Sequence, residues 1–569
     1  MLFVVTYFAL NAQTRTSHFI EMPDGVKLAA DVYLPQDYKS EALPTLVLFE
    51  RYWRSSIDVK TGDTSTIIGQ EKFFSDHGYI IVIVDTRGTG ASFGTRQSEY
   101  SPLQVADSKT VLDWIVDQSW SNGKVGSYGV SYSGTTAELL CATQHPALKA
   151  VIPGWSDFDL YRSPARPYGM LASTFVKRWG FYVKLLDRNR SLFLRSAINP
   201  VVSDSLNPAL KEHKGNLDVY RYTRDSEFRN SAGNGLTYEE CSVVHWQKEI
   251  EASEVPMFIM ASWMDAGTAE GAIQRLEHFS NPQKVLLMST SHGAGSNANP
   301  FTVGDTLFYP IPSRPEQSLM MLEFFDHYVK GEDKGVEDWP LIQYYNIGEN
   351  EFRESDVWPI EGSTDSSFYF QSNQLLSQEL IDTSGKDSYT VDFDVATSEF
   401  NRWTTQMEGG VLGLNRRQEM DERMLTYTSQ PLRSDMQITG TPEVQLYLST
   451  THEDGVVLVY LEDVAPDGTS TYLTEGGLRL MHRKLAGPTD STFNLHTFNE
   501  EDAEAMIPNQ AEKIHLRLLP TSVTIKKGHS IRIAIAGADK SIFDRCPKHG
   551  TPELTIHHSS KIVLPVILE

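Results

Sequence analysis

The stretch GKVGSYGVSYSGTTAELL, residues 123–140, holds one serine where a nucleophile could be presented. Ser131 lies between a strand-like run that ends at Val130 and a helix-like run that begins at Thr135. Gly129 and Gly134 flank it, and a tight strand-to-helix turn favours glycine where side chains would collide. The pattern departs from G-x-S-x-G because its second glycine comes one position later, and serine among glycines is also common in ordinary loops. Ser131 is therefore a candidate nucleophile that needs catalytic partners elsewhere in the chain.

A serine nucleophile requires a base to take its proton and a carboxylate to orient that base. The apolar run VPMFIMASWMD ends at Asp265, and KVLLMSTSHG carries His292 just past its apolar part. Acid and base follow the serine in the order Ser, Asp, His in known proteins with this kind of turn, each at the carboxyl end of a strand. We therefore predict that Ser131, Asp265 and His292 form a triad at one edge of a sheet.

Other residues could fill these roles. His145 is the main rival base, although QHPAL places it in a turn before a proline, where a surface or packing role suits it better. Asp157 and Asp159 are weaker candidates for the acid, and Asp265 could instead cap the helix that follows it.

The tetrahedral intermediate also needs two oxyanion donors. The backbone N–H of Tyr132, directly after the serine, is the expected first donor. The phenol of Tyr52, in the loop after PTLVLFE, is a candidate for the second, although a tyrosine in a loop is usually a packing residue.

The elements that must position these residues alternate between strand and helix. Residues 18–35 predict two strands around a Pro-Asp-Gly turn, and the apolar run 79–84 is typical of a strand buried on both faces of a parallel sheet. A helical pattern over 107–116 precedes the serine turn, and the strand LKAVIP follows it. We interpret this alternation as an α/β fold with a doubly wound sheet.

Two further regions of the chain have different residue patterns. Residues 157–250 are aromatic, charged and rich in helix formers without strand alternation, which predicts a helical cap inserted into the sheet domain. The predicted core therefore comprises 16–156 and 251–335. Residues 336–569 carry short alternating strands between turn residues, which predicts a C-terminal all-β sandwich.

Composition limits the partners. The chain has 569 residues and a net charge of −24 spread along its length, so nucleic acid is not an expected partner. Three distant cysteines, Cys141, Cys241 and Cys546, show no metal spacing and allow one disulfide at most. No apolar run is long enough for a membrane span. We expect no cofactor and no metal, and the oligomeric state is open.

The first residues read MLFVVTYFALNAQTR, with an apolar run of signal-peptide length from Leu2 to Leu10. We interpret residues 1–15 as the remnant of an export signal, with cleavage after Ala12, and expect a periplasmic or secreted protein. The basic leader of such signals is missing. An N-terminal strand in a cytoplasmic protein is the alternative.

Several stretches together resemble one family of serine hydrolases. They are DTRGTGAS, DWIVDQSWSNGKVGSYGVSYSG, ASWMDAG, STSHG and FFDHYVKG. The family groups cocaine esterase, glutaryl-cephalosporin acylases, α-amino-acid ester hydrolases and X-prolyl dipeptidyl peptidases, and the resemblance runs from Phe19 to the end of the chain. It implies an α/β-hydrolase core, a helical cap and a C-terminal jelly-roll domain.

The resemblance also implies residue roles. Ser131 matches the nucleophile, Asp265 the acid and His292 the base, while Tyr52 matches an oxyanion donor that acts with the Tyr132 amide. Arg87 and Asp85 are expected to brace loops beside the site. Two departures are visible. The long X-prolyl dipeptidyl peptidases carry an additional N-terminal domain before the hydrolase strands, whereas here we expect those strands to begin by about residue 18. No carboxylate cluster for a free amine can be identified. Glu50, Asp157 and Asp159 are the candidates for such a cluster.

These observations favour a serine acyl hydrolase that cleaves small ester or amide bonds without strict amine recognition. The first alternative keeps the site but makes it an X-prolyl dipeptidyl-peptidase, an α-amino-acid ester hydrolase or a β-lactam acylase, acting on an amide or short peptide. The second alternative is a glycan- or protein-binding protein with a vestigial hydrolase core.

Overall fold

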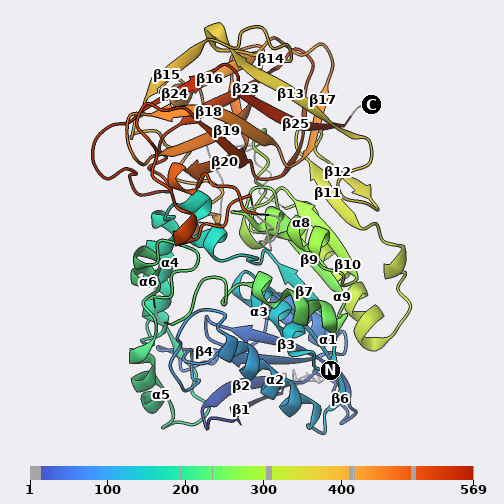
Figure 1. Ribbon diagram of the computed structural model, residues 1–569. Coiled ribbons are helices and arrows are strands. Elements are labelled where there is room, and N and C mark those ends of the chain that lie inside the picture. The colour runs from blue at the N-terminus through green and yellow to red at the C-terminus, as the bar shows by residue number, and fades with distance from the viewer. Residues whose placement is uncertain are drawn as a thin grey trace, which may run out of the picture.

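The computed structural model describes residues 14–191, 195–233, 235–302, 310–408, 414–415, 417–487 and 495–567. The apolar run predicted as an export signal lies outside these residues. The chain forms an α/β unit, in the lower half of Figure 1, and a β domain stacked against one end of it. No helix in the described part of the chain combines the length and apolar character that crossing a membrane requires.

The α/β unit is built on a ten-stranded sheet with the order β1-β2-β5-β3-β6-β7-β9-β10-β11-β12. The run from β5 to β11 is parallel, and antiparallel strands close both edges. The strands are β1 (Arg15–Glu21), β2 (Lys27–Tyr33), β3 (Leu43–Glu50), β5 (Ile80–Asp85), β6 (Ser121–Val130), β7 (Leu148–Gly154), β9 (Met257–Ser262), β10 (Gln283–Met288), β11 (Ile342–Asn346) and β12 (Glu351–Ser355). The predicted α/β class is confirmed, and the carboxyl ends of the parallel strands meet at one edge.

Helices cover both faces of this sheet. Alternate strand residues point to opposite faces, so Val47 packs in one apolar cluster and Leu46 in another. The first cluster includes residues of α2 (Pro102–Val116), α3 (Tyr132–Leu139) and α8 (Thr268–His278). The second includes residues of α1 (Gly69–Asp76) and α9 (Arg314–Phe325). Burial on both faces explains the continuous apolar strands of the sequence.

The regular structure of the segment between β7 and β9 is mainly helical, as predicted. It carries α4 (Ser173–Leu186), α5 (Leu206–Glu212), α6 (Val219–Asp225) and α7 (Gln247–Ser253). It also contributes β8 (Ser196–Ile198), which pairs with β4 (Ser56–Asp58) of the core. A three-residue strand is too short for an alternating pattern to show in the sequence.

The first sheet continues past residue 335, where the sequence predicted the sandwich to begin. β11 pairs in parallel with β10, and β12 then pairs antiparallel with β11. The sequence did not predict this pairing, because a short alternating strand does not reveal in its own residues which sheet it joins.

The β domain contains a thirteen-stranded sheet that folds into the layers seen at the top of Figure 1. Its strands are β13 (Ser363–Gln371), β14 (Leu375–Ser377), β15 (Lys386–Thr390), β16 (Leu425–Ser429), β17 (Met436–Gly440), β18 (Glu443–Thr450), β19 (Val456–Val464), β20 (Ser470–Arg479), β21 (Glu512–Arg517), β22 (Thr521–Ile525), β23 (Ser530–Ala536), β24 (Glu553–His557) and β25 (Lys561–Ile567). Two short helices, α10 (Thr405–Glu408) and α11 (Gln418–Asp421), lie in its connections. The predicted all-β C-terminal region is confirmed.

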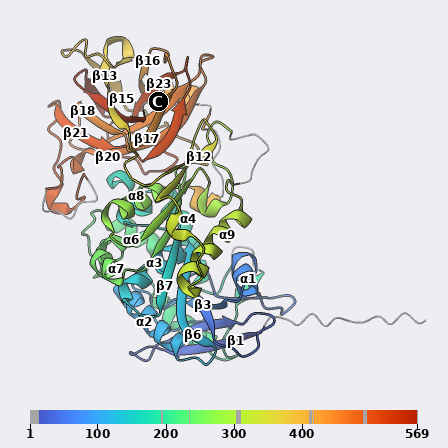
Figure 2. The same cartoon turned by 90° about the vertical axis from the view of Figure 1, so that its right-hand side faces the viewer.

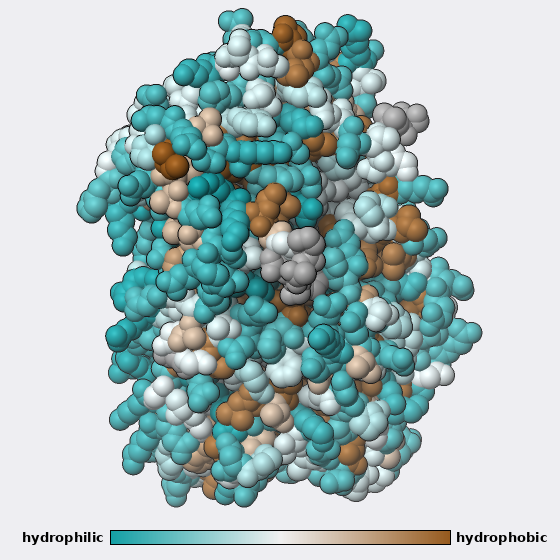
Figure 3. Space-filling view, in the orientation of Figure 1, coloured by the Kyte–Doolittle hydropathy of each residue, from teal (hydrophilic) through white to brown (hydrophobic). Residues whose placement is uncertain are grey.

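The face of the molecule in Figure 3 is mainly hydrophilic, with small apolar patches scattered over it. This distribution fits the acidic composition, because charged side chains spread over a surface favour solubility.

Candidate active site

Ser131 occupies a strained turn between β6 and α3. Its backbone has φ 63° and ψ −123°, a conformation that costs a non-glycine residue free energy and is often found at functional sites. A Cβ on Gly129 would overlap the backbone of Ser133, and a Cβ on Gly134 would lie 2.6 Å from the carbonyl oxygen of Gly154. The two glycines are therefore required by close backbone approach. The second comes one position late because it lies where α3 passes β7.

Backbone hydrogen bonds fix the turn. Ser131 N–H donates to the carbonyl of Gly154 at 2.9 Å, and Thr135 N–H donates to the carbonyl of Ser131 at 2.9 Å. Tyr132 is the first residue of α3, so its amide has no acceptor within the helix. The Tyr132 phenol is buried, and Gln104 Nε2 donates to it at 2.7 Å. The phenol of Tyr132 is thus already hydrogen-bonded, whereas its amide has no acceptor within the helix.

Asp265 and His292 follow the neighbouring parallel strands β9 and β10, and they are hydrogen-bonded. His292 Nδ1 lies 2.8 Å from Asp265 Oδ2, and Asp265 is fully buried. Burial by itself would lower the pKa of His292, but the charge and hydrogen bond of Asp265 and the charge of Asp157 outweigh it, so this pKa lies above 6.5. A proton on Nδ1 leaves Nε2 of the neutral ring as an acceptor.

The histidine loop lies against the serine turn. A Cβ on Gly293 would be 3.0 Å from Val130 Cγ1, so the residue after His292 contacts the residue before Ser131. The three strand ends therefore bring all three predicted triad residues to one region of the sheet edge.

A cavity opens beside Ser131 and Tyr132, and seven of the twenty described residues that line it are aromatic. Tyr52 and Tyr100 of the core line it, as do Trp179 on α4 and Tyr222 on α6 of the cap. Gln406, on α10 of the β domain, also lines the cavity. Cavities of this kind, apolar with a few polar groups, are the usual form of small-molecule sites.

Tyr52 is oriented by the cap. Trp179 Nε1 donates to the Tyr52 hydroxyl oxygen at 3.0 Å, and the Tyr52 ring stacks on Tyr182. Because the oxygen accepts from Trp179, the hydroxyl proton is available to a ligand in the cavity. Burial raises the pKa of Tyr52, so the phenol stays protonated at neutral pH.

The three carboxylates considered for amine recognition have different surroundings. Asp157 lines the cavity, and burial raises its pKa to about 7. Asp159 pairs with Arg229 at 3.1 Å. Glu50 accepts from the Tyr52 amide at 3.2 Å, and burial raises its pKa to about 7.

The remaining candidates occupy structural positions. His145 Nε2 contacts Asp113 Oδ1 at 3.1 Å, outside the residues that line the cavity. Arg87 bonds to Asp107, at 2.7 Å, and to Asp24. Asp85 accepts two bonds from Arg54. The expected bracing roles of Arg87 and Asp85 fit these ion pairs.

Sequence reasoning missed three residues at this site: Thr405, Gln406 and Trp179. Thr405 Oγ1 donates to Asp265 Oδ1 at 2.6 Å from 140 positions away in the chain. No local pattern marks these residues, because a threonine, a glutamine and a tryptophan at such positions are ordinary packing residues.

A doubly wound sheet with a strained serine turn and a histidine–aspartate pair at its carboxyl edge defines a serine hydrolase of the α/β-hydrolase type. The family model for X-Pro dipeptidyl-peptidase (S15 family) matches residues 24–294. The model for the X-Pro dipeptidyl-peptidase C-terminal non-catalytic domain matches residues 334–563. The chain belongs to this family of serine hydrolases, and the resemblance seen in the sequence is confirmed.

Individual relatives of the chain support this family assignment. A Mycobacterium bovis protein named "Putative serine esterase Mb1866c" is 35% identical over 97% of this chain and 95% of its own length. The cocaine esterase of Rhodococcus sp. is 26% identical over 98% and 99% of the two chains. An aminopeptidase structure from a marine sediment Thaumarchaeota archaeon has a TM-score of 0.76 at 19% identity, covering 98% of this chain and 97% of that one. At that identity it shows a shared fold.

Proposed function

We propose that the protein is a serine acyl hydrolase that cleaves small esters, with Ser131 as nucleophile, His292 as base and Asp265 as the orienting acid. The observation that carries the proposal is the 2.8 Å bond from His292 to Asp265 at the same sheet edge as the strained turn of Ser131. The Tyr132 amide and the Tyr52 hydroxyl are the proposed oxyanion donors, because both residues line the cavity beside Ser131.

In the proposed mechanism, His292 Nε2 takes the Ser131 hydroxyl proton while Oγ attacks the ester carbonyl. The carbonyl oxygen becomes an oxyanion that accepts from Tyr132 N–H and Tyr52 O–H. The imidazolium then gives its proton to the leaving alcohol, and the acyl group stays on Ser131. Water, deprotonated by His292, attacks this acyl-enzyme, and the proton returns to Ser131 as the acid leaves.

The test is the variant Ser131→Ala assayed on p-nitrophenyl acetate. We expect kcat to fall on the order of 10⁵-fold, because removal of a nucleophile leaves only binding and oxyanion contributions. Ser127→Ala is the matched control, since Ser127 lies four positions earlier on β6 and donates to the Val47 carbonyl at 2.6 Å. Undiminished turnover by Ser131→Ala, or failure of a fluorophosphonate to label Ser131, would contradict the proposal.

A free-amine requirement is the second candidate, and the observation that favours it is Asp157. This half-buried carboxyl lines the cavity, and its enclosed Oδ1 has no hydrogen-bond partner among the described residues. The ammonium group of a substrate with a free amine could supply the positive charge that pairs with Asp157. Rates on N-blocked and unblocked X-Pro anilides decide: a strong preference for the free amine supports peptidase or amino-ester activity, and equal rates exclude it.

A further inference from the structure

A short segment between β15 and β16 connects the β domain to the loop that carries Asp265. We call residues 401–406 the strap. Arg402 Nη1 donates to the Tyr472 hydroxyl at 3.2 Å, and Trp403 Nε1 donates to Glu475 Oε1 at 2.6 Å. Tyr472 and Glu475 lie on β20, and they are bonded to each other at 3.0 Å. The strap is therefore anchored in the β domain.

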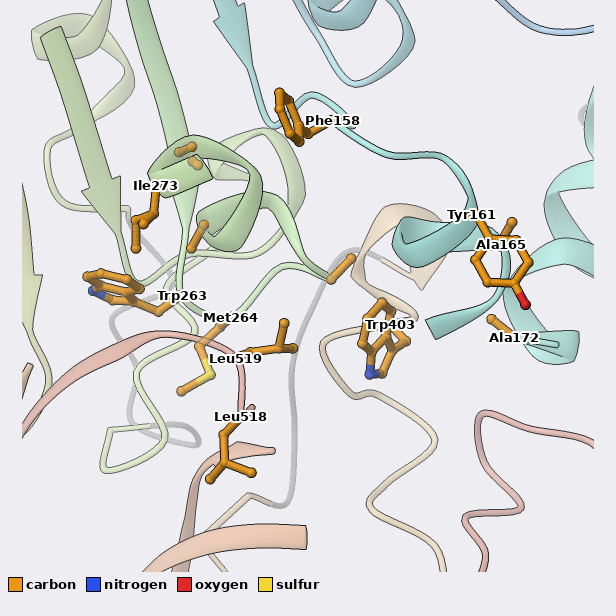
Figure 4. Close-up of a cluster of buried hydrophobic side chains, with 14 of the residues drawn as sticks. Phe158, Tyr161, Ala165, Ala172, Trp263, Met264, Ile273, Trp403, Leu518 and Leu519 are labelled. Carbon is orange, nitrogen blue, oxygen red and sulfur yellow. The ribbon is translucent and has the colours of Figure 1, made fainter. Parts of the chain in front are cut away.

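The other side of the strap holds the aspartate loop. Ala266 N–H donates to the Arg402 carbonyl at 2.9 Å, and Arg402 Nε donates to the Ala266 carbonyl at 3.2 Å. The Arg402 guanidinium also donates to the Trp263 carbonyl. Figure 4 shows Leu519 of the β domain next to Met264 of this loop and between it and Trp403, with Tyr161 and Ala165 of the cap on the other side of Trp403. Asp265 thus sits in a loop clamped on both of its flanks.

Thr405 completes the clamp at the carboxylate itself. Its Oγ1 lies 2.6 Å from Asp265 Oδ1, while the other carboxylate oxygen bonds to His292. The hydroxyl has one proton and a second acceptor in reach, the Arg402 carbonyl at 2.8 Å. An ionised carboxylate is the stronger acceptor, and it is also the nearer one. Both Thr405 and Asp265 are buried, so water cannot replace this bond.

We propose that Thr405 is a positioning residue for the reaction: it fixes the Asp265 carboxylate and, through it, the ring of His292. The inference rests on the proposed function and extends it, because it makes the β domain a part of the catalytic apparatus. Without the Thr405 donor the carboxylate could rotate about its Cβ–Cγ bond. Its oxygens would also carry more negative charge, which stabilises the imidazolium and raises the pKa of His292.

The test compares Thr405→Val, Thr405→Ala and Thr405→Ser with the matched control Thr397→Val. Thr397 is also a buried threonine whose hydroxyl donates to a buried carboxylate, that of Asp539, within the β domain and away from the cavity. The assay measures kcat and KM on p-nitrophenyl acetate across pH, the rate of fluorophosphonate labelling across pH, and thermal unfolding.

We expect Thr405→Val and Thr405→Ala to lower kcat by about 10- to 100-fold, the range for loss of one hydrogen bond to a charged group, with KM changed less than about twofold. The acid limb of kcat/KM and of the labelling rate should move to higher pH. Thr405→Ser should restore kcat to within about threefold. Thr397→Val should lose stability while keeping the wild-type kcat and pH profile.

Three results would overturn the inference: wild-type kcat and pH profile in Thr405→Val, an equal loss of kcat in Thr397→Val, or failure of both the Val and Ala variants to fold. The last would make Thr405 a structural residue. Ser131→Ala shows whether the proposed function itself has failed: that variant would then keep its activity. If Ser131→Ala is inactive and Thr405→Val is unchanged, only the positioning role is wrong.

Discussion

The α/β unit and the β domain each contain a buried aspartate that holds a histidine. His292 Nδ1 lies 2.8 Å from Asp265, and His529 Nδ1 lies 2.8 Å from Asp463. The two pairs have the same atoms at the same distance. The first lies where Gly293 contacts the turn of Ser131, whereas His529 and Asp463 connect a turn to the end of β19. A histidine–aspartate bond therefore identifies a catalytic candidate only when a nucleophile and a cavity lie beside it.

Two carboxyls with raised pKa values show the same contrast. Burial raises the pKa of Asp157 and of Glu462 to about 7. Asp157 borders the cavity that holds Ser131, while Glu462 lies 3.0 Å from the guanidinium of Arg417 in the β domain. Perturbed pKa values gather at functional sites, but structural ion pairs perturb them too. The position of the group relative to a cavity separates the two cases.

The substitution with the largest expected effect tests the two histidine pairs against each other. Asp265→Asn should lower kcat about 10⁴-fold, because the amide stabilises the wrong histidine tautomer and cannot balance the imidazolium. Asp463→Asn should leave kcat on p-nitrophenyl acetate unchanged. Equal activities in these two variants would remove the distinction between the pairs.

The second test concerns stability. Glu462→Gln should lower the free energy of unfolding by about 3–5 kcal/mol at pH 8, since it leaves the buried Arg417 guanidinium without its carboxylate. Urea unfolding measures the loss, and kcat of the folded fraction should stay at the wild-type value. A kcat that falls with stability would mean that the β domain acts on the site through Glu462 as well.

The third test asks whether the cap-oriented phenol acts on the reaction. Tyr52→Phe should lower kcat about 100-fold or more, the range for loss of one oxyanion donor, with a smaller change in KM. Tyr427→Phe is the matched control, because that phenol donates to Asp387 at 2.9 Å inside the β domain. If both variants keep full kcat, Tyr52 is a packing residue.

The smallest expected effect is a shift in pH dependence. The charge of Asp157 raises the pKa of His292, so Asp157→Asn should lower it and move the acid limb of kcat/KM to lower pH by less than about one unit. Because the folded pKa of Asp157 is raised from 3.8 to about 7, the wild-type protein loses stability as pH rises through that window. Asp157→Asn should flatten this loss, and Glu462→Gln should not move the acid limb. An unmoved acid limb in Asp157→Asn would show that its charge does not reach His292.

The sequence by itself determined the α/β class, the all-β C-terminal region, and the polar residues that follow β6, β9 and β10. These features are local. A buried strand, a glycine forced by close backbone approach and a polar residue after a strand leave their pattern in neighbouring residues, and parallel strands bring their carboxyl ends to one edge whatever the loops between them do.

Only the tertiary structure decided which distant groups meet at that edge. Thr405 reaches Asp265 across 140 positions, Trp179 reaches Tyr52 across 127, and β11 joins the first sheet. No periodicity encodes such contacts, because they depend on how the cap and the β domain pack against the core and not on any residue's neighbours in the chain.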